Sequence, residues 1–238
     1  QCLVGSEMCI RDSIKVVGKN VYVQVFESTR GLKVGAEAEF TGHMLEVTLG
    51  PGMLSKNYDG LQNDLDKMEG VFLKRGQYTY PLDKERKWHF KPIVKVGDEV
   101  GPSAWLGEVE ENHQPLKIMV PFQLTGTYKV KSVVPEGDYI IEDTVVVLSD
   151  KGGEDIKVNM IQKWPVKKAM TNYVEKPRPY KLLETGVRVI DTMNPIVEGG
   201  TGFIPGPFGT GKTVLQHAIS KQAEADIVII AACGERAN

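Results

Sequence analysis

Hydrophobic residues recur at every second position in many short segments of the first 165 residues, which predicts a β-rich region. The earliest segments with this period contain Val21, Val23 and Val25, and then Leu45, Val47 and Leu49. Glycines interrupt them, so we predict short strands forming a small N-terminal β-barrel. Residues 59–69 instead place Leu61, Leu65 and Met68 at helical spacing, and Gly70 follows. We therefore assign residues 14–70 to the β-barrel and a following helix.

A second β-rich region covers residues 93–164 after a connecting segment at residues 71–95. Its expected strands are residues 118–120, 128–134, 139–141, 145–148 and 156–161. Pro177 and Pro179 stand among polar residues and indicate a linker. We assign residues 96–180 to a β-rich bulge insertion with this linker.

The chain changes character after residue 180. Phe203 and Ile204 form a short apolar segment, a glycine-rich loop follows, and then apolar residues recur at helical spacing from Val214 to Ile219. Residues 227–233 are a continuous apolar run that ends in Cys233, as expected of a parallel strand buried on both faces. The pattern predicts a βαβ unit with a parallel sheet at residues 181–238. Cys233 is then a small core residue.

The composition is that of a globular protein. The 238 residues carry a net charge of −2, so no general attraction to nucleic acid or to an anionic membrane is expected. No apolar run approaches the roughly 18 residues that span a bilayer. The three cysteines form no CxxC pair, and the four histidines form no pair with metal-ligand spacing. Composition therefore predicts neither a disulfide framework nor a metal site built from side chains alone.

The two ends differ from the rest of the chain. Residues 1–13 have neither a strand nor a helical period, and they lack the basic start and apolar segment of a signal peptide. We interpret them as a non-native tail. Only five residues follow the apolar run 227–233, so we interpret the chain as a truncated fragment.

The strongest chemical signal is Gly-Pro-Phe-Gly-Thr-Gly-Lys-Thr at residues 206–213, which fits G-x-x-x-x-G-K-[S/T] between an expected strand and an expected helix. Its glycines let backbone N–H groups surround phosphates, and the helix directs its positive end at the same anion. Lys212 supplies a charge for the β- and γ-phosphates, and Thr213 a hydroxyl for Mg²⁺. The predicted ligands are therefore ATP or ADP and Mg²⁺. The predicted nucleotide-binding residues are Gly206, Pro207, Phe208, Gly209, Thr210, Gly211, Lys212, Thr213 and Val214.

A second signal is Gly234-Glu235-Arg236, directly after the expected parallel strand. Ligands of open α/β sheets lie at this edge. A carboxylate at Glu235 can orient the attacking water, and Arg236 lies close enough in sequence to meet the developing charge. The predicted catalytic residues are Glu235, Lys212 and Arg236.

Further motifs surround the loop. They are GGTGFIP at residues 199–205, Gln216-His217, ADIVII at 225–230 and CGER at 233–236, with RVIDT at 188–192, WHFKP at 88–92 and GDEV at 97–100 upstream. With these motifs, residues 14–238 resemble the catalytic A subunits of V/A-type rotary ATPases. The resemblance implies that residues 181–238 are the start of a truncated P-loop (RecA-like) parallel-sheet domain. The Gly-Pro-Phe-Gly form and Gln216-His217 favour this type over the F-type β subunit. Thr210 stands where eukaryotic A subunits often carry Cys, so the resemblance implies a prokaryotic source without that redox switch.

The resemblance implies a membrane-associated ATPase or ATP synthase that couples ATP hydrolysis or synthesis to H⁺ or Na⁺ transport. Its implied partners are B subunits in an alternating A/B hexameric ring, central and peripheral stalk subunits, and through the stalks a membrane sector that translocates ions. The implied location is peripheral, on the cytoplasmic face of a membrane, with no nucleic acid partner. The neighbouring B subunit would supply an arginine finger, and the 238 residues alone are expected to be inactive.

Three other interpretations have distinct sequence requirements. A biotinyl or lipoyl carrier would place a modifiable lysine on a central hairpin, whereas the nearest match, Lys168-Ala169-Met170, follows the β region. A non-catalytic ring subunit would lack the complete Gly-Lys-Thr loop and the Gly-Glu-Arg that follows. An RNA translocase of the Rho type would need a basic, aromatic surface ahead of its core, which the net charge of −2 does not favour.

Overall fold

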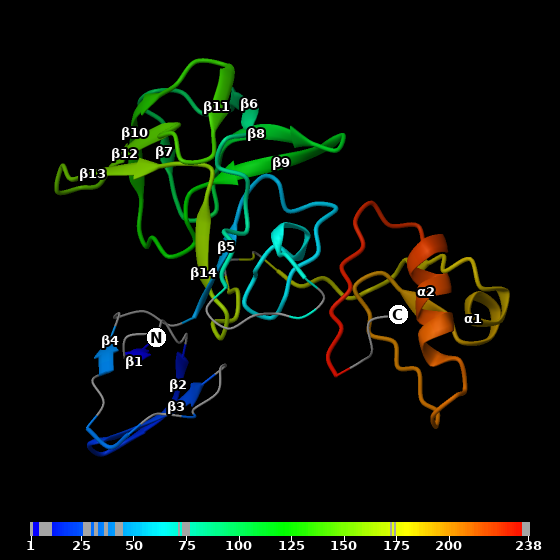
Figure 1. Ribbon diagram of the computed structural model, residues 1–238. Coiled ribbons are helices and arrows are strands. Elements are labelled where there is room, and N and C mark those ends of the chain that lie inside the picture. Colours follow the sequence, from blue (N-terminus) through cyan, green and yellow to red (C-terminus); the bar gives the residue numbers. More distant parts are fainter. Residues whose placement is uncertain are drawn as a thin grey trace. The chain divides into compact units, whose positions relative to one another are not determined.

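The computed structural model describes residues 2–4, 11–25, 30, 33–35, 38–40, 45–70, 72, 77–171, 173 and 175–234. The chain divides into two units, residues 1–172 and residues 173–238, and each has its own internal organisation. Figure 1 labels strands of the first unit and the two helices of the second. No helix among the described residues has both the length and the apolar composition needed to cross a bilayer.

The N-terminal part of the first unit consists of paired strands. β2 (Arg11–Val17) and β3 (Asn20–Val25) form an antiparallel hairpin with a bulge between Ser13 and Lys15. β1 (Cys2–Val4) pairs with β4 (Ala38–Phe40). β3 confirms the strand predicted around residues 21–25. β1 and the start of β2 fall within residues 1–13, whose interpretation as a non-native tail concerns their origin and stays a prediction.

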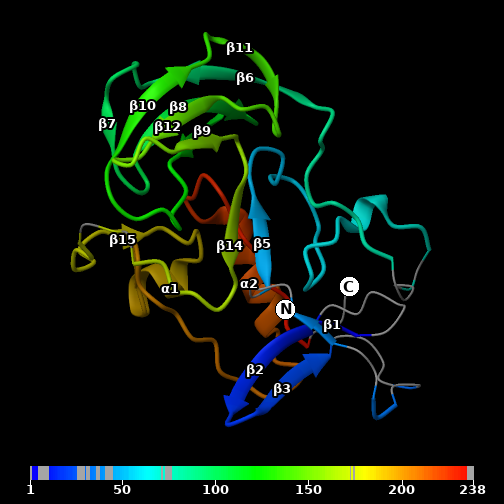
Figure 2. The ribbon, with the colours of Figure 1, turned by 90° about the vertical axis from the view of Figure 1, so that its left-hand side faces the viewer.

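A sandwich of two four-stranded antiparallel sheets forms the centre of the first unit (Figure 2). One sheet has the order β11-β6-β8-β9, with bounds Gly137–Ile140, Lys87–Pro92, Trp105–Glu111 and Gln114–Met119. The other has the order β13-β12-β10-β7, with bounds Asp155–Val158, Val146–Ser149, Tyr128–Val133 and Glu99–Val100. Beside the sandwich, β5 (Glu46–Leu49) pairs with β14 (Gln162–Pro165).

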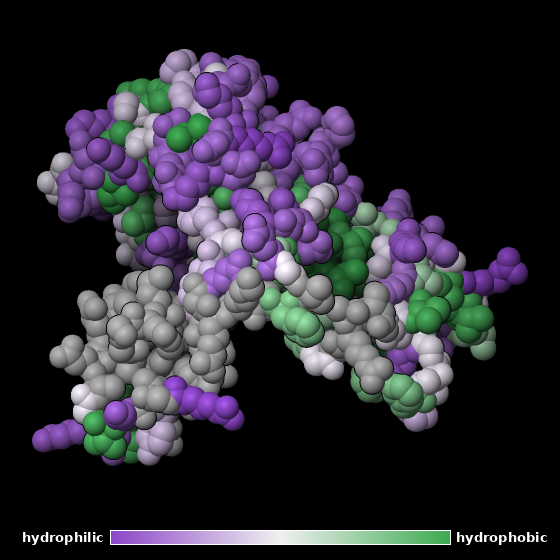
Figure 3. Space-filling view, in the orientation of Figure 1, coloured by the Kyte–Doolittle hydropathy of each residue, from purple (hydrophilic) through white to green (hydrophobic). Residues whose placement is uncertain are grey.

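The hydrophobic core of the described residues lies inside this sandwich. In β6, Trp88 and Phe90 are buried while His89 and Lys91 between and after them are exposed, as the period of a strand requires. All the buried hydrophobic side chains of the described residues fall between Leu82 and Met160. The visible outer surface of the sandwich is mainly polar (Figure 3). The β segments predicted within residues 118–161 are confirmed, with the bounds given above.

The helix predicted over residues 59–69 is wrong. Only a single 3-10 turn, η1 (Leu65–Lys67), forms there. The Asp59 carboxylate accepts hydrogen bonds from the backbone N–H groups of Leu61 and Asn63, at 2.9 and 2.8 Å, and from the Asn63 side chain at 2.8 Å. Such local side-chain bonds offer the backbone an alternative to helical hydrogen bonding, and here they hold it in turns.

The second unit contains two helices and one small sheet. β15 (Leu182–Leu183) pairs with β16 (Ile196–Val197), and α1 (Arg188–Met193) lies between them in sequence. α2 (Lys212–Gln222) confirms the helix predicted after the glycine-rich loop. Among the described residues of this unit, no hydrophobic side chain is fully buried.

The two parallel strands expected on either side of α2 are absent from the described residues. Residues 203–204 and 227–233 form no strand, and Ile229 is 90% exposed. A strand exists only where its N–H and C=O groups bond to a neighbour, and no described strand pairs with these residues. Cys233, predicted as a core residue, is exposed for the same reason.

Packing in the sandwich generates a stability prediction at Gly107 on β8. A Cβ built there would lie 2.3 Å from two ring carbons of Phe90, which is fully buried, and 2.9 Å from the backbone oxygen of Lys91. Gly107→Ala is expected to destabilise the fold by about 1–3 kcal/mol, as overpacked cores do. Denaturant unfolding measures this. Gly60→Ala is the matched control, because a Cβ at Gly60 meets nothing within 4 Å; equal effects of both variants would refute the packing argument.

Candidate functional site

Residues 206–213 form a tight loop that leads directly into α2. Gly209 and Gly211 have φ angles of 80° and 78°, in the left-handed region that side chains other than glycine rarely adopt. The Thr210 hydroxyl donates to the Pro207 carbonyl oxygen at 2.8 Å, which closes the turn between them. The motif predicted from sequence therefore has the curved backbone that its chemistry needs.

The Lys212 ammonium lies against the carbonyl oxygens of this loop. Its Nζ atom donates to the backbone oxygens of Gly206 and Pro207, each at 2.7 Å. An ammonium has three donors, so one more can reach an anion. These bonds hold the charge at the loop rather than out in solvent, which places Lys212 where a phosphate bound to the loop would meet it.

The N-terminus of α2 begins at this same lysine. Gly211 is the N-cap residue, and within the described chain no side chain caps the helix. The first N–H groups of a helix have no partner inside it, and they carry the positive end of the helix dipole. The exposed Thr213 stands in this first turn. The helix start therefore offers an anion both N–H donors and a hydroxyl.

An apolar cavity of about 960 Å³ lies on another face of α2. Its hydrophobic lining comes from α1, β16, the segment before the loop and α2, through Ile190, Ile196, Phe203, Ile204, Leu215 and Ile219. Neither Lys212 nor Thr213 lines it. The cavity is therefore distinct from the loop that is predicted to bind phosphate, although both include residues of α2.

The structure brings together one of the two groups of site residues predicted from sequence. The residues from Gly206 to Val214 form the loop and the first turn of α2. Glu235 and Arg236 lie outside the described residues, so their predicted roles stay predictions. The exposed Gly234 precedes them directly.

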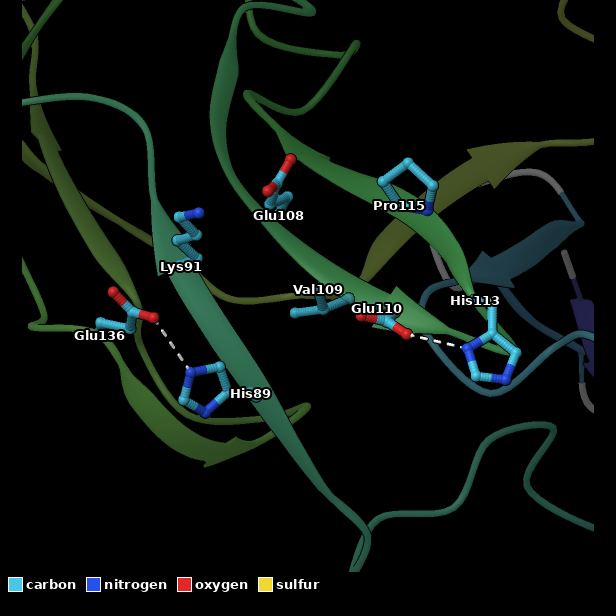
Figure 4. Close-up of a pocket in the computed structure, with 8 residues that line it drawn as sticks. All are labelled: His89, Lys91, Glu108, Val109, Glu110, His113, Pro115 and Glu136. Atoms are coloured by element: carbon cyan, nitrogen blue, oxygen red, sulfur yellow. Dashed lines mark hydrogen bonds and ion pairs between the residues drawn. The ribbon is translucent and has the colours of Figure 1, made fainter.

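A second polar site, on the sandwich, was not expected from the scattered histidines. His89, Lys91, Glu108, Glu110, His113 and Glu136 line a pocket of about 350 Å³ (Figure 4). His89 stands directly across from Asp138 in the register of β6 with β11. Its Nδ1 atom lies 2.8 Å from an Asp138 carboxylate oxygen, and its Nε2 atom lies 3.2 Å from one of Glu136. The strand register, which the sequence does not reveal, creates this contact.

The electrostatics of this pocket favour a charged imidazole. Hydrogen bonds to Asp138 and then to Glu136 raise the pKa of His89 above its usual value. The His113 ring pairs separately with Glu110 at 3.3 Å. Within the described part of the chain, no group of three or more metal-ligating side chains is arranged to hold a metal ion. In this pocket, a charged His89 on β6 therefore forms an ion pair with Asp138 on the neighbouring strand β11.

Three family models match successive parts of the chain. The ATP synthase alpha/beta family beta-barrel domain matches residues 13–42, the ATP synthase alpha/beta subunit barrel-sandwich domain residues 79–167, and the ATP synthase alpha/beta family nucleotide-binding domain residues 186–238. Together they confirm the fold class: an N-terminal β-barrel, a β-rich region, and a nucleotide-binding domain that contains the loop.

Curated relatives match nearly the whole chain. It is 50% identical over 237 residues to the V-type ATP synthase alpha chain of Treponema denticola, covering 98% of this chain and 40% of the relative. The chain of the same name from Borrelia garinii subsp. bavariensis is 48% identical over 227 residues, and that from Protochlamydia amoebophila 45% over 227 residues. These alignments cover 94% of this chain and 40% and 38% of the relatives. The chain thus spans about two fifths of the length of these relatives.

The raised pKa of His89 predicts a pH-dependent contribution to stability. Because the pKa is higher in the folded state, the contribution is complete below the unfolded value of about 6.5 and is lost as pH rises through the folded value. His89→Gln should therefore lower the free energy of unfolding more at pH 6 than at pH 9. Denaturant titrations at both values measure this. In a background of Glu136→Gln with Asp138→Asn, the pH-dependent difference should disappear, and its persistence there would contradict the assignment.

Proposed function

Since the chain belongs to the ATP synthase alpha/beta family, we propose that it acts in the catalytic subunit of a membrane-associated rotary ATPase. In this function, ATP hydrolysis or synthesis is coupled to the transport of H⁺ or Na⁺. The relatives' name, V-type ATP synthase alpha chain, supports the assignment to a rotary ATPase.

One observation carries the proposal: the loop at residues 206–213 holds the Lys212 ammonium directly at the N-terminus of α2. The Lys212 ammonium donates hydrogen bonds to the loop, and Lys212 is also the first residue of α2, where the helix N–H groups have no partner inside the helix. All these groups are positive or donate hydrogen bonds. The arrangement is suited to a polyphosphate and unsuited to a cation or a neutral sugar.

The roles of the side chains follow from this arrangement. The residues from Gly206 to Val214 bind the nucleotide phosphates, and Lys212 also stabilises the charge that develops on the transferred phosphoryl group. The exposed Thr213 hydroxyl fits Mg²⁺, which takes oxygen ligands from side chains, phosphates and water. When bound, Mg²⁺ neutralises charge on the β- and γ-phosphate oxygens. Glu235 orients and polarises the attacking water, and Arg236 contacts the phosphates nearby.

The assembly and its location are part of the same proposal. B subunits alternate with this subunit in a hexameric ring, and stalk subunits connect the ring to an ion-translocating membrane sector. The subunit then binds peripherally at the cytoplasmic face of the membrane.

The alternative functions have less support. A non-catalytic ring subunit would lack the complete set of Lys212, Thr213 and Glu235, which this chain contains. An RNA translocase needs a basic stacking surface, whereas the exposed strands of the sandwich carry mixed charges, such as Lys131 paired with Asp155 at 2.6 Å.

Lys212→Ala tests the phosphate-binding role in the complete, assembled enzyme. The variant should raise the Kd of Mg-ATP by roughly tenfold or more, because a charge-assisted contact to the phosphates is lost. Fluorescent nucleotide titration measures it. Lys221→Ala is the matched control, since Lys221 lies in the last turn of the same helix. If both variants bound Mg-ATP as tightly as the parent, the loop would not be the nucleotide site.

Glu235→Gln tests the water-activating role in the same enzyme. Gln keeps the size of the side chain but not its negative charge, so binding should be nearly unchanged while single-turnover hydrolysis falls by roughly 100-fold or more. Glu224→Gln, at an exposed carboxylate just after α2, is the control. Hydrolysis by Glu235→Gln at the parental rate would remove Glu235 from the mechanism.

A further inference from the structure

A buried hydroxyl and a carboxylate fix the turn that precedes α1. Thr185 is fully buried, the only side chain of the second unit's described residues to be so. Its hydroxyl donates to an Asp191 carboxylate oxygen at 2.6 Å and accepts from the backbone N–H of Val187 at 3.2 Å. Neither residue belongs to the phosphate loop, so the loop chemistry does not explain this contact.

Asp191 also binds the backbone of the same turn. One carboxylate oxygen accepts from the Thr185 N–H at 3.0 Å, and the other accepts from the Gly186 N–H at 3.1 Å. These bonds, the Thr185 hydroxyl foremost, hold the pKa of Asp191 below its usual range. The carboxylate is therefore charged at neutral pH and clamps three donors of two neighbouring residues.

This turn rests against the far end of the phosphate-loop helix. The backbone N–H of Glu224, just beyond α2, donates to the Glu184 carbonyl oxygen at 3.1 Å. Gly186 has a φ of 73°, and a Cβ added there would lie 2.8 Å from the Cβ of Gln222, the last residue of α2. The turn and the helix end are thus in direct backbone contact, with no room for a side chain between them.

We propose that Asp191 and Thr185 are positioning residues for the nucleotide site, because they hold the turn that fixes the C-terminal end of α2. The helix has 11 residues and is about 16 Å long, so a change of tilt at Gln222 displaces Lys212 and Thr213 at the other end. The inference rests on the proposed function, since it assumes that the loop binds Mg-ATP. It assigns the two residues no contact with the nucleotide.

Asp191→Asn and Thr185→Val, made in the complete assembled enzyme, test the proposal. Asn replaces one accepting oxygen by a donor, and Val removes the hydroxyl at nearly constant volume. Measured well below the melting temperature of each variant, both substitutions should raise the Kd and the KM for Mg-ATP by about tenfold. The kcat should fall by less than the KM rises, because Lys212 and Thr213 meet the phosphates in the ground state as well as during transfer. Thr185→Ser should restore parental affinity, since it keeps the hydroxyl.

Two control variants separate this role from general stability and from the proposed function. Thr192→Val removes a hydroxyl of α1 that donates to Arg188 O at 2.7 Å, within its own helix, and it should leave the Kd unchanged. Lys212→Ala shows whether the loop itself binds Mg-ATP. If the parent enzyme does not bind Mg-ATP, the proposed function is refuted.

The possible results then divide clearly. If the parent binds and Lys212→Ala does not, an unchanged Kd in both Asp191→Asn and Thr185→Val overturns only the positioning role, even if their melting temperatures fall. A raised Kd that Thr185→Ser fails to restore also overturns it. Should those two variants not assemble, Gly186→Ala replaces them, because its Cβ presses on Gln222. If that variant also failed to assemble, the turn would serve folding and the inference would be refuted.

Discussion

The need of every strand for hydrogen-bonded neighbours decides which parts of this chain form sheets. The sandwich meets that need in part with strands that follow each other closely in sequence. β8 and β9 are separated only by Asn112 and His113, and β12 and β13 are also consecutive. Antiparallel pairing permits such short connections, whereas parallel pairing needs a long crossover. Two four-stranded sheets therefore close around one core within about 80 residues.

The same constraint explains the second unit. Residues 227–233 have the composition of a strand buried on both faces, yet no described strand pairs with them and their side chains are exposed. Hydrophobic character alone does not make a strand, because the backbone must also be paired. Among the described residues of this unit, the buried Thr185 and Asp191 instead form a local network of hydrogen bonds.

Most of the fold was predictable wherever a period of two coincided with nearby pairing partners, as in β3, β10 and β12. The prediction failed where local chemistry competed with the period. The apolar spacing from Leu61 to Met68 favours a helix, but the Asp59 carboxylate binds two of the N–H groups near its start. The register in which β6 pairs with β11 could not be predicted from the sequence either. His89 and Asp138 are 49 positions apart, and only the pairing of β6 with β11 places them face to face.

The loop at residues 206–213 was predictable for the opposite reason: its geometry depends on neighbours only a few positions away. Left-handed backbone at Gly209 and Gly211, the Thr210 bond to Pro207 and the Lys212 bonds to Gly206 and Pro207 all lie within eight residues. None of these contacts requires the parallel sheet. The orientation of the loop, however, depends on residues outside it, because the loop leads into α2 and α2 has contacts at its other end. The motif therefore defines the shape of the proposed anion site, and in our proposal the contacts of Gly186 and Glu184 with the end of α2 determine where that site is directed.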